Sequence, residues 1–218
     1  MSSALLKQVA GLLPRDTQDA LKRRHFRSQI NAGTFIPDEP EILALPDLLS
    51  PGDACIDVGA NVGHYTLAMS RQVGSTGRVI AFEPMLESFD ILTANIRASH
   101  ATNITLLNLA ASNSNGIVAM SLPGNNFYRA HISATGDHHV MSTMLDSLTL
   151  PKIRLIKIDA EDHDLAVLQG AEKLISRDRP ILIVESGEAG PIPQWLHDHG
   201  YTVSHFTGSP NVVARPLI

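Results

Sequence analysis

Cysteine, basic charge and long apolar runs are all scarce in this chain of 218 residues. The single cysteine, Cys55, cannot form a disulfide within the chain, so a reducing compartment fits best. No apolar stretch approaches the ~20 residues that a membrane-spanning helix needs. Near the first residue, Ala4-Leu5-Leu6 is soon interrupted by Lys7 and Gln8, which is unlike a secretion signal. These absences predict a cytoplasmic protein with no membrane partner.

The balance of charge and the length further limit which partners and how many domains we expect. Lys and Arg number 17 against 22 Asp and Glu, which gives a net charge of −5. Because the phosphates of nucleic acids call for a basic face, this balance argues against a nucleic-acid partner. At this length we expect one buried core. Residues 51–218 should form the main domain, and residues 1–50 a helical extension or lid.

After Pro51-Gly52 the pattern alternates between apolar strands and amphipathic helices. This alternation predicts an α/β fold with a mostly parallel seven-stranded sheet and helices on both faces. Strands are expected at 54–58, 78–83, 104–109, 153–159 and 180–185, followed by a hairpin of 201–206 and 212–215. Helices are expected at 3–13, 17–30, 41–49, 64–73, 88–99 and 192–199, and after residue 162. Residues 112–149 are less regular, with one further strand indicated at 116–122.

Four acidic residues stand at or next to the ends of predicted strands. They are Asp57, Glu83, Asp159 and Glu185. In sheets of this kind ligands bind beyond the carboxyl ends of the strands. We therefore expect the functional site at the edge where these carboxylates meet, with Asp159 and Glu185 on adjacent strands.

The first strand runs into a glycine-rich turn, Asp57-Val58-Gly59-Ala60-Asn61-Val62-Gly63. Glycines let the backbone turn sharply and approach a ligand closely. A phosphate-binding P-loop would need Gly-Lys-Ser or Gly-Lys-Thr, but His64 and Tyr65 follow Gly63. A dinucleotide-binding turn would need a third glycine, and it would direct a helix N-terminus at a pyrophosphate.

Charge separates the cofactors that remain. S-adenosylmethionine carries a sulfonium and an ammonium, whereas NAD presents a dianionic pyrophosphate. A carboxylate ~4 Å from a unit charge changes the binding energy by up to ~4 kcal/mol at an effective dielectric constant near 20. Asp57, Asp159 and Glu161 therefore favour S-adenosylmethionine, and Glu83 can accept hydrogen bonds from the ribose hydroxyls of either cofactor. Asp57 could instead be a capping or turn-stabilising carboxylate.

Several segments, in the same order, resemble the FkbM-type methyltransferases. They are Pro51-Gly52-Asp53, the turn from Ile56 to Gly63, Ala81-Phe82-Glu83-Pro84, Met144-Leu145-Asp146, Lys157-Ile158-Asp159-Ala160-Glu161, Val167-Leu168-Gln169-Gly170-Ala171 and Ile183-Val184-Glu185. The similarity extends over roughly residues 35–201. It implies a class I methyltransferase fold, S-adenosylmethionine as methyl donor and O-methylation of a hydroxyl on a sugar or natural product.

With this resemblance, ten residues are our candidates for the site. We expect the cofactor to be bound by Asp57, Gly59, Asn61, Gly63, Glu83, Ala110 and Ala111, and catalysis to involve Asp159, Glu161 and Glu185. One segment departs from the family, because Asp162-His163-Asp164 replaces Gly-x-Glu. We attribute this to a helix start, in which Asp162 caps a helix beginning at His163 and Asp164 favours its dipole.

Several questions stay open on the sequence alone. A histidine from the irregular segment could be the general base, and the candidates are His131, His138 and His139. Their spacing and the absence of a cysteine cluster argue against zinc. Asp159 and Glu185 could hold Mg²⁺ through oxygen ligands, as in catechol-type methyltransferases. The chain could also be an NAD-dependent dehydrogenase or epimerase, or a non-catalytic nucleoside-binding module, and it could form a homo-oligomer.

Overall fold

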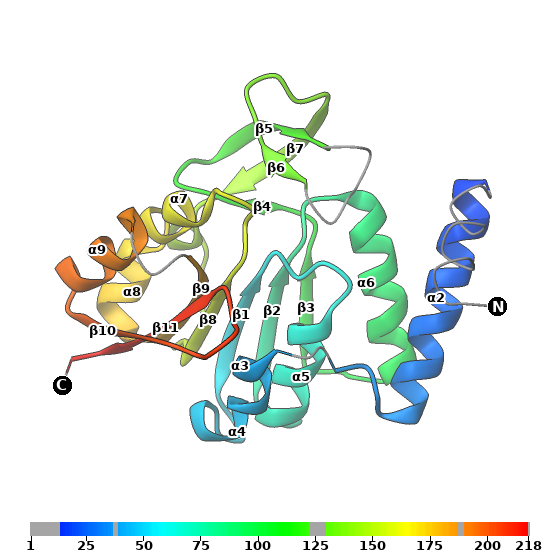
Figure 1. Ribbon diagram of the computed structural model, residues 1–218, viewed down its shortest axis with the longest axis horizontal. Helices are drawn as coiled ribbons and strands as arrows, with labels where there is room; N and C mark the ends of the chain where they lie inside the picture. The colour runs from blue at the N-terminus through cyan, green and yellow to red at the C-terminus, as the bar shows by residue number, and fades with distance from the viewer. Residues whose placement is uncertain (1–13, 37–38, 123–129, 187–189, 218) are drawn as a thin grey trace.

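A computed structural model describes residues 14–36, 39–122, 130–186 and 190–217, with a seven-stranded sheet at the centre (Figure 1). The spatial order of its strands is β10-β11-β9-β8-β1-β2-β3. Among the described strands of this sheet, only β11 runs opposite to the common direction of the others, so the predicted mostly parallel α/β fold is confirmed. The strands are β1 (Ala54–Val58), β2 (Arg78–Phe82), β3 (Ile104–Leu107), β8 (Leu155–Ile158), β9 (Ile181–Glu185), β10 (Tyr201–His205) and β11 (Asn211–Pro216).

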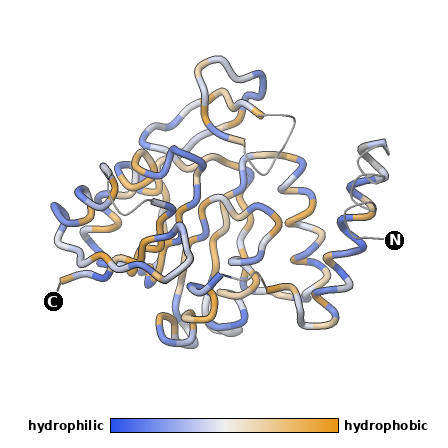
Figure 2. Tube along the Cα trace, in the orientation of Figure 1, coloured by the Kyte–Doolittle hydropathy of each residue, from blue (hydrophilic) through white to orange (hydrophobic). Residues whose placement is uncertain are grey.

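The central strands β1 and β8 are buried along their whole length. Strands covered on both faces need nearly continuous apolar sequence, and apolar residues do concentrate in the centre of the molecule (Figure 2). Two charged residues break this rule, Asp57 in β1 and Lys157 in β8. They are cross-strand partners in the parallel register, which places an acid beside a base inside the sheet.

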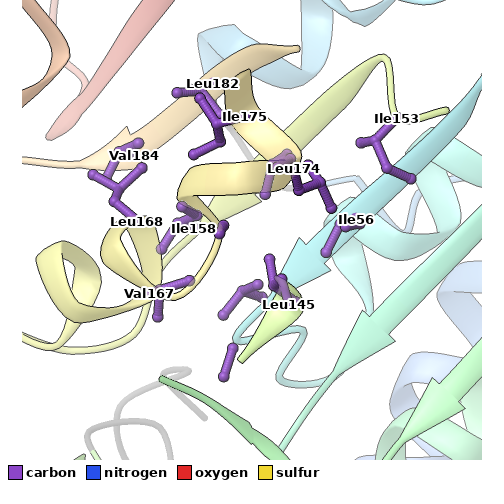
Figure 3. Packing of buried hydrophobic residues seen from close by; sticks show 14 of the residues in the cluster. Ile56, Leu145, Ile153, Ile158, Val167, Leu168, Leu174, Ile175, Leu182 and Val184 are labelled. Carbon is purple, nitrogen blue, oxygen red and sulfur yellow. The ribbon is translucent and has the colours of Figure 1, made fainter. Parts of the chain in front are cut away.

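Helices cover both faces of the sheet. The face that carries Ile56, Ile158 and Val184 packs against Val167 and Leu168 of one helix and Leu174 and Ile175 of the next (Figure 3). Burying an aliphatic side chain of this size stabilises the fold by roughly 1.5–3 kcal/mol. The helices on this face are α7 (Asp164–Gln169), α8 (Glu172–Asp178) and α9 (Pro191–Asp198). The opposite face is covered by α3 (Pro40–Leu43), α4 (Leu45–Leu48), α5 (His64–Val73) and α6 (Leu86–Ser99).

The N-terminal segment is helical, as expected, but divided differently. Helix α2 (Arg15–Ala32) lies along α6 and is slightly longer than predicted (Figure 1). The predicted single helix 41–49 is wrong, because α3 ends at Leu43 and α4 starts afresh. Pro46 lies in the first turn of α4 and has no N–H to continue the helical ladder. The helix expected at 3–13 lies outside the described residues, and in the described part no helix could span a membrane.

A second, smaller sheet lies beyond the edge where β1, β2 and β3 end (Figure 1). Its order is β4-β7-β5-β6, and its strands are β4 (Ala110–Ala111), β5 (Gly116–Ser121), β6 (His131–Ile132) and β7 (His138–Thr143). The strand predicted at 116–122 is therefore confirmed as β5. The sheet brings Met120 of β5 and Ile132 of β6 over the carboxyl ends of the central strands, where they line a hollow.

Candidate active site

Two hollows lie side by side at the carboxyl ends of the strands. The first contains about 620 Å³ of unfilled space, part of it open to solvent. Of the predicted site residues, those that line it are Gly59, Asn61, Glu83, Ala110, Ala111, Asp159 and Glu161. Its walls are otherwise mainly apolar, and Met85, Leu109, Met120 and Ile132 contribute to them. The structure thus brings most of the predicted cofactor residues together around one space.

The turn after β1 depends on Gly59. This residue has φ +73°, and a Cβ there would overlap the backbone carbonyl oxygen of Asp159. The N–H groups of Gly59 and Ala60 both donate to the carbonyl of Phe82, at 3.0 and 2.9 Å. Gly59 is therefore the point at which the ends of β1, β2 and β8 meet. Gly63, with φ +96°, faces Leu92 of α6 and does not line the hollow.

Glu83 joins the same turn from the end of β2. Its two carboxylate oxygens accept hydrogen bonds from the backbone N–H of Asn61 at 2.8 Å and of Met85 at 2.9 Å. Burial raises the pKa of Glu83 to about 7, although these two hydrogen bonds act in the opposite direction. Each oxygen keeps a further lone pair for a ligand hydroxyl. Beside it, the Oδ1 of Asn61 is buried without a partner among the described residues, and so can accept a hydrogen bond from a ligand.

Replacing Glu83 by glutamine should weaken cofactor binding. The amide keeps the size of the side chain but loses its charge. Its NH₂ group would face a backbone N–H, from which it cannot accept a hydrogen bond. Charge-assisted hydrogen bonds contribute roughly 1.5–3 kcal/mol, so affinity for S-adenosylhomocysteine should fall about 10- to 100-fold. Calorimetric titration measures this, with Glu87→Gln on the neighbouring helix as the matched control. Equal affinities for the two variants would assign Glu83 a structural role only.

Asp57 lies beneath the first hollow. Its side chain is fully buried, accepts a hydrogen bond from Thr66 of α5 and does not line either hollow. Burial raises the pKa of Asp57, against the lowering effects of Lys157 and Thr66. Because side chains of a strand alternate between its faces, Asp57 points to the face covered by α5. The structure therefore places it as a support of the turn, and direct contact with a cofactor stays a prediction.

Asp159 and Glu185 meet at the ends of β8 and β9, which are adjacent and parallel as predicted. Each carboxyl group shifts the pKa of the other. Burial opposes ionisation of Asp159, but the Lys157 ammonium, with Nζ 2.8 Å from Oδ2, outweighs it and holds the pKa of Asp159 below its ordinary value. Burial and the neighbouring Asp159 raise the pKa of Glu185 to about 8. These opposite shifts make Asp159 the ionised member of the pair at neutral pH and Glu185 the protonated one.

The segment after Asp159 differs from the sequence-based expectation. Asp162 makes no helix cap, since α7 begins at Asp164 with His163 at the N-cap position. Instead, the carboxylate of Asp164 accepts a hydrogen bond from the backbone N–H of Ala160 at 2.9 Å and closes the loop. Asp162 itself has φ +70°, a conformation that favours glycine. This backbone conformation agrees with the glycine that the family resemblance implies at this position.

His163 is a residue of this site that the sequence analysis missed. It lines the first hollow, and its Nε2 lies 2.9 Å from the hydroxyl of Ser112. Burial lowers the pKa of His163, so the ring is neutral at pH 7. The sequence did offer one signal for this role, because His163 lies in the loop that directly follows the strand-end acid Asp159. His131, His138 and His139 instead lie in β6 and β7 of the small sheet and line neither hollow.

The second hollow continues from the first, and Glu161 lines both. It contains about 1170 Å³ of unfilled space, including open solvent. Carboxyl groups dominate its lining, from Glu161, Asp162, Asp164 and Glu185, and the described residues that line it include no lysine or arginine. The remaining walls come from Ser186 and from residues 205–210, which include the end of β10 and the turn that leads to β11.

Comparison with known proteins agrees with this arrangement. A model of the methyltransferase FkbM domain matches residues 57–203. The hexuronic acid methyltransferase AglP of Haloferax volcanii is 27% identical over 184 residues, covering 77% of this chain and 68% of AglP. The crystal structure of methyltransferase FkbM from Methylobacillus flagellatus KT aligns with a TM-score of 0.59 at 18% identity. That alignment covers 76% of this chain but only 44% of the other, so this chain matches less than half of it.

A second structure matches over nearly its whole length. A Streptococcus mutans protein solved in complex with SAH has a TM-score of 0.53 at 12% identity, with coverage of 81% of this chain and 96% of that one. The fold, the family model and the strand-end acids agree with one another. The chain therefore belongs to the FkbM family of methyltransferases, and its fold is that of S-adenosylmethionine-dependent enzymes.

Proposed function

We propose that this chain transfers a methyl group from S-adenosylmethionine to a hydroxyl of a sugar or related natural product. The observation that carries the proposal is the meeting of two hollows at Asp159, Glu161 and Glu185. One hollow suits an adenosine-containing donor, and the other leaves room for an acceptor. The name of the relative AglP, a hexuronic acid methyltransferase, supports a sugar as the acceptor class.

The residues of the first hollow fit the donor. Glu83 and the Oδ1 of Asn61 can accept hydrogen bonds from ribose hydroxyls and the amino acid portion, and apolar walls beside Ala110 and Ala111 suit the adenine ring. Asp159 and Glu161 give the other end a negative charge, which attracts a sulfonium or ammonium and repels the pyrophosphate of NAD. When bound, S-adenosylmethionine supplies an electrophilic methyl group.

The chain's own residues then position and deprotonate the acceptor. Asp159 is ionised and can accept the hydrogen bond of an acceptor hydroxyl, while the Lys157 ammonium holds its Oδ2 at 2.8 Å. Holding two reactants in line supplies much of the rate enhancement in such transfers. We propose that Asp159 also receives the hydroxyl proton as the new bond forms. Lys157 already provides a cation beside Asp159, so we propose that the reaction does not depend on Mg²⁺.

The acidity of the second hollow makes the charge of the acceptor testable. Carboxyl groups within ~4 Å of an acceptor carboxylate would disfavour it by up to ~4 kcal/mol, so a neutral glycoside should exceed the matching uronic acid at least about tenfold in kcat/KM. The matched pair is p-nitrophenyl glucoside and p-nitrophenyl glucuronide, assayed with labelled donor in the presence of EDTA. High salt should narrow the difference by screening.

Three outcomes of this assay speak against the proposal. Failure of both glycosides and of a wider hydroxyl panel would remove the sugar acceptor. Preference for the glucuronide would contradict the charge argument. Loss of activity in EDTA with recovery on addition of Mg²⁺ would favour the alternative that Asp159 and Glu185 are metal ligands.

Three further predictions rest on the composition and on α2. We propose that the chain acts in the cytoplasm, without nucleic acid, and that residues 1–50 are a packing extension of the domain formed by residues 51–218. The contact of α2 with α6 supports the last of these. A homo-oligomer stays open, and sedimentation of the purified chain would decide it.

A further inference from the structure

Lys157 is an unusual residue for the centre of a sheet. It lies in β8 with only 3% of its side chain exposed. Lysine is almost never buried to this extent unless its charge is paired. Asp159, beyond the end of its own strand, forms an ion pair with it at 2.8 Å, and Asp57 on the adjacent strand adds a second negative charge nearby.

An aromatic ring and a further acid complete the surroundings of the ammonium. Nζ lies 5.0 Å from the centre of the Tyr65 ring, in cation–π geometry. The hydroxyl of Tyr65 donates a 2.6 Å hydrogen bond to Glu39, which precedes α3. The ammonium is thus held in place by elements from three parts of the chain. Its direct hydrogen bond, at 2.8 Å, is directed to Asp159 at the border of the hollows.

We infer that Lys157 is a positioning residue for methyl transfer, whose buried ammonium fixes the Asp159 carboxylate between the donor and acceptor hollows. The inference rests on the proposed function, because it assigns Asp159 to the reacting groups. Lys157 itself lines neither hollow, so it acts through Asp159.

Stability alone does not account for this arrangement. Buried ion pairs are costly to desolvate, and apolar residues of similar volume often give an equally or more stable fold. Asp57 is fully buried and lies opposite Lys157 in the register of the sheet, yet Lys157 forms its ion pair with Asp159, whose side chain is 38% exposed. A cation placed to hold a partly exposed carboxylate is expected where the orientation of that carboxylate matters.

The test compares Asp57→Asn with the double variant Asp57→Asn/Lys157→Met. The first variant removes the carboxylate that Lys157→Met alone would leave buried without its cation, so both proteins should fold. We expect the double variant to turn over about 100-fold more slowly than Asp57→Asn, since a displacement near 1 Å can cost that factor. Its affinity for S-adenosylhomocysteine should fall by no more than about tenfold, because Glu83 and Asn61 still bind the nucleoside at the other end of the donor hollow. Lys173→Met, an exposed lysine of α8, is the control for the substitution.

The outcomes separate the inference from the function on which it rests. Absence of turnover in the unaltered chain over the whole hydroxyl panel would remove the proposed function, and the inference with it. Normal turnover in the unaltered chain and equal turnover in the two variants would overturn the inference alone. A parallel fall in affinity, turnover and melting temperature would also overturn it, since that pattern marks a purely structural role.

Discussion

Replacing Gly59 by alanine should disable the donor site. The new Cβ would overlap the Asp159 carbonyl oxygen, so the turn after β1 or the end of β8 must move. A left-handed φ costs a non-glycine residue ~1–2 kcal/mol, and steric overlap in a packed region typically costs ~1–3 kcal/mol more. We expect a loss of about 2–5 kcal/mol in the free energy of unfolding and about 100-fold or more in affinity for S-adenosylhomocysteine.

Gly33→Ala separates the two causes of this loss. Gly33 ends α2 with φ +70°, close to the value of +73° at Gly59, but a Cβ at Gly33 would meet no heavy atom within 4 Å beyond its chain neighbours. It should therefore lose only the ~1–2 kcal/mol of backbone strain and keep its cofactor affinity. Chemical denaturation and calorimetric titration of both variants give the comparison. If Gly59→Ala behaved like Gly33→Ala, the close approach of the turn to β8 would not be essential.

The sequence predicted the main sheet well because its strands are buried on both faces. The runs 54–58, 78–83 and 180–185 are nearly all apolar and are bounded by turn residues, so their ends could be placed to within a residue or so. Acids at those ends were then expected to meet, since parallel strands present their carboxyl ends at one edge. Glu83, Asp159 and Glu185 follow this reasoning, and the structure places them at that edge.

The sequence could not predict in the same way how deeply a side chain is buried or which short, distant segments pair as strands. Asp57 is the fourth residue of β1 and points to the α5 face, so it supports the turn from below while Gly59 and Asn61 border the hollow. The strands β4 and β6 are too short to show any periodicity, and they exist only because they pair with β7 and β5. The shape of the loop after β8 depends on the left-handed backbone conformation of Asp162. The sequence alone favoured a helix cap at this residue, but the N-cap position is His163.

Neutralising Asp159 is expected to lower turnover far more than neutralising Glu185. Asp159→Asn removes the ionised carboxylate that we assign to the acceptor hydroxyl. A general base typically contributes a factor of ~10² to 10⁴, so turnover should fall by at least about 100-fold, and a smaller loss would indicate orientation alone. Glu185→Gln keeps a hydrogen-bond donor toward Asp159 and should lower turnover at pH 7 by no more than about tenfold.

The pH profile distinguishes the roles of the two acids. Because the pKa of Glu185 is raised to about 8, this side chain is protonated below that pH and becomes charged above it. Turnover of the unaltered chain should therefore decrease as the pH rises through about 8, when a second negative charge appears beside Asp159. Glu185→Gln cannot ionise and should lose this decrease. If turnover of the unaltered chain rose through the same range, Glu185 would be the general base, and it would receive the proton of the acceptor hydroxyl in place of Asp159.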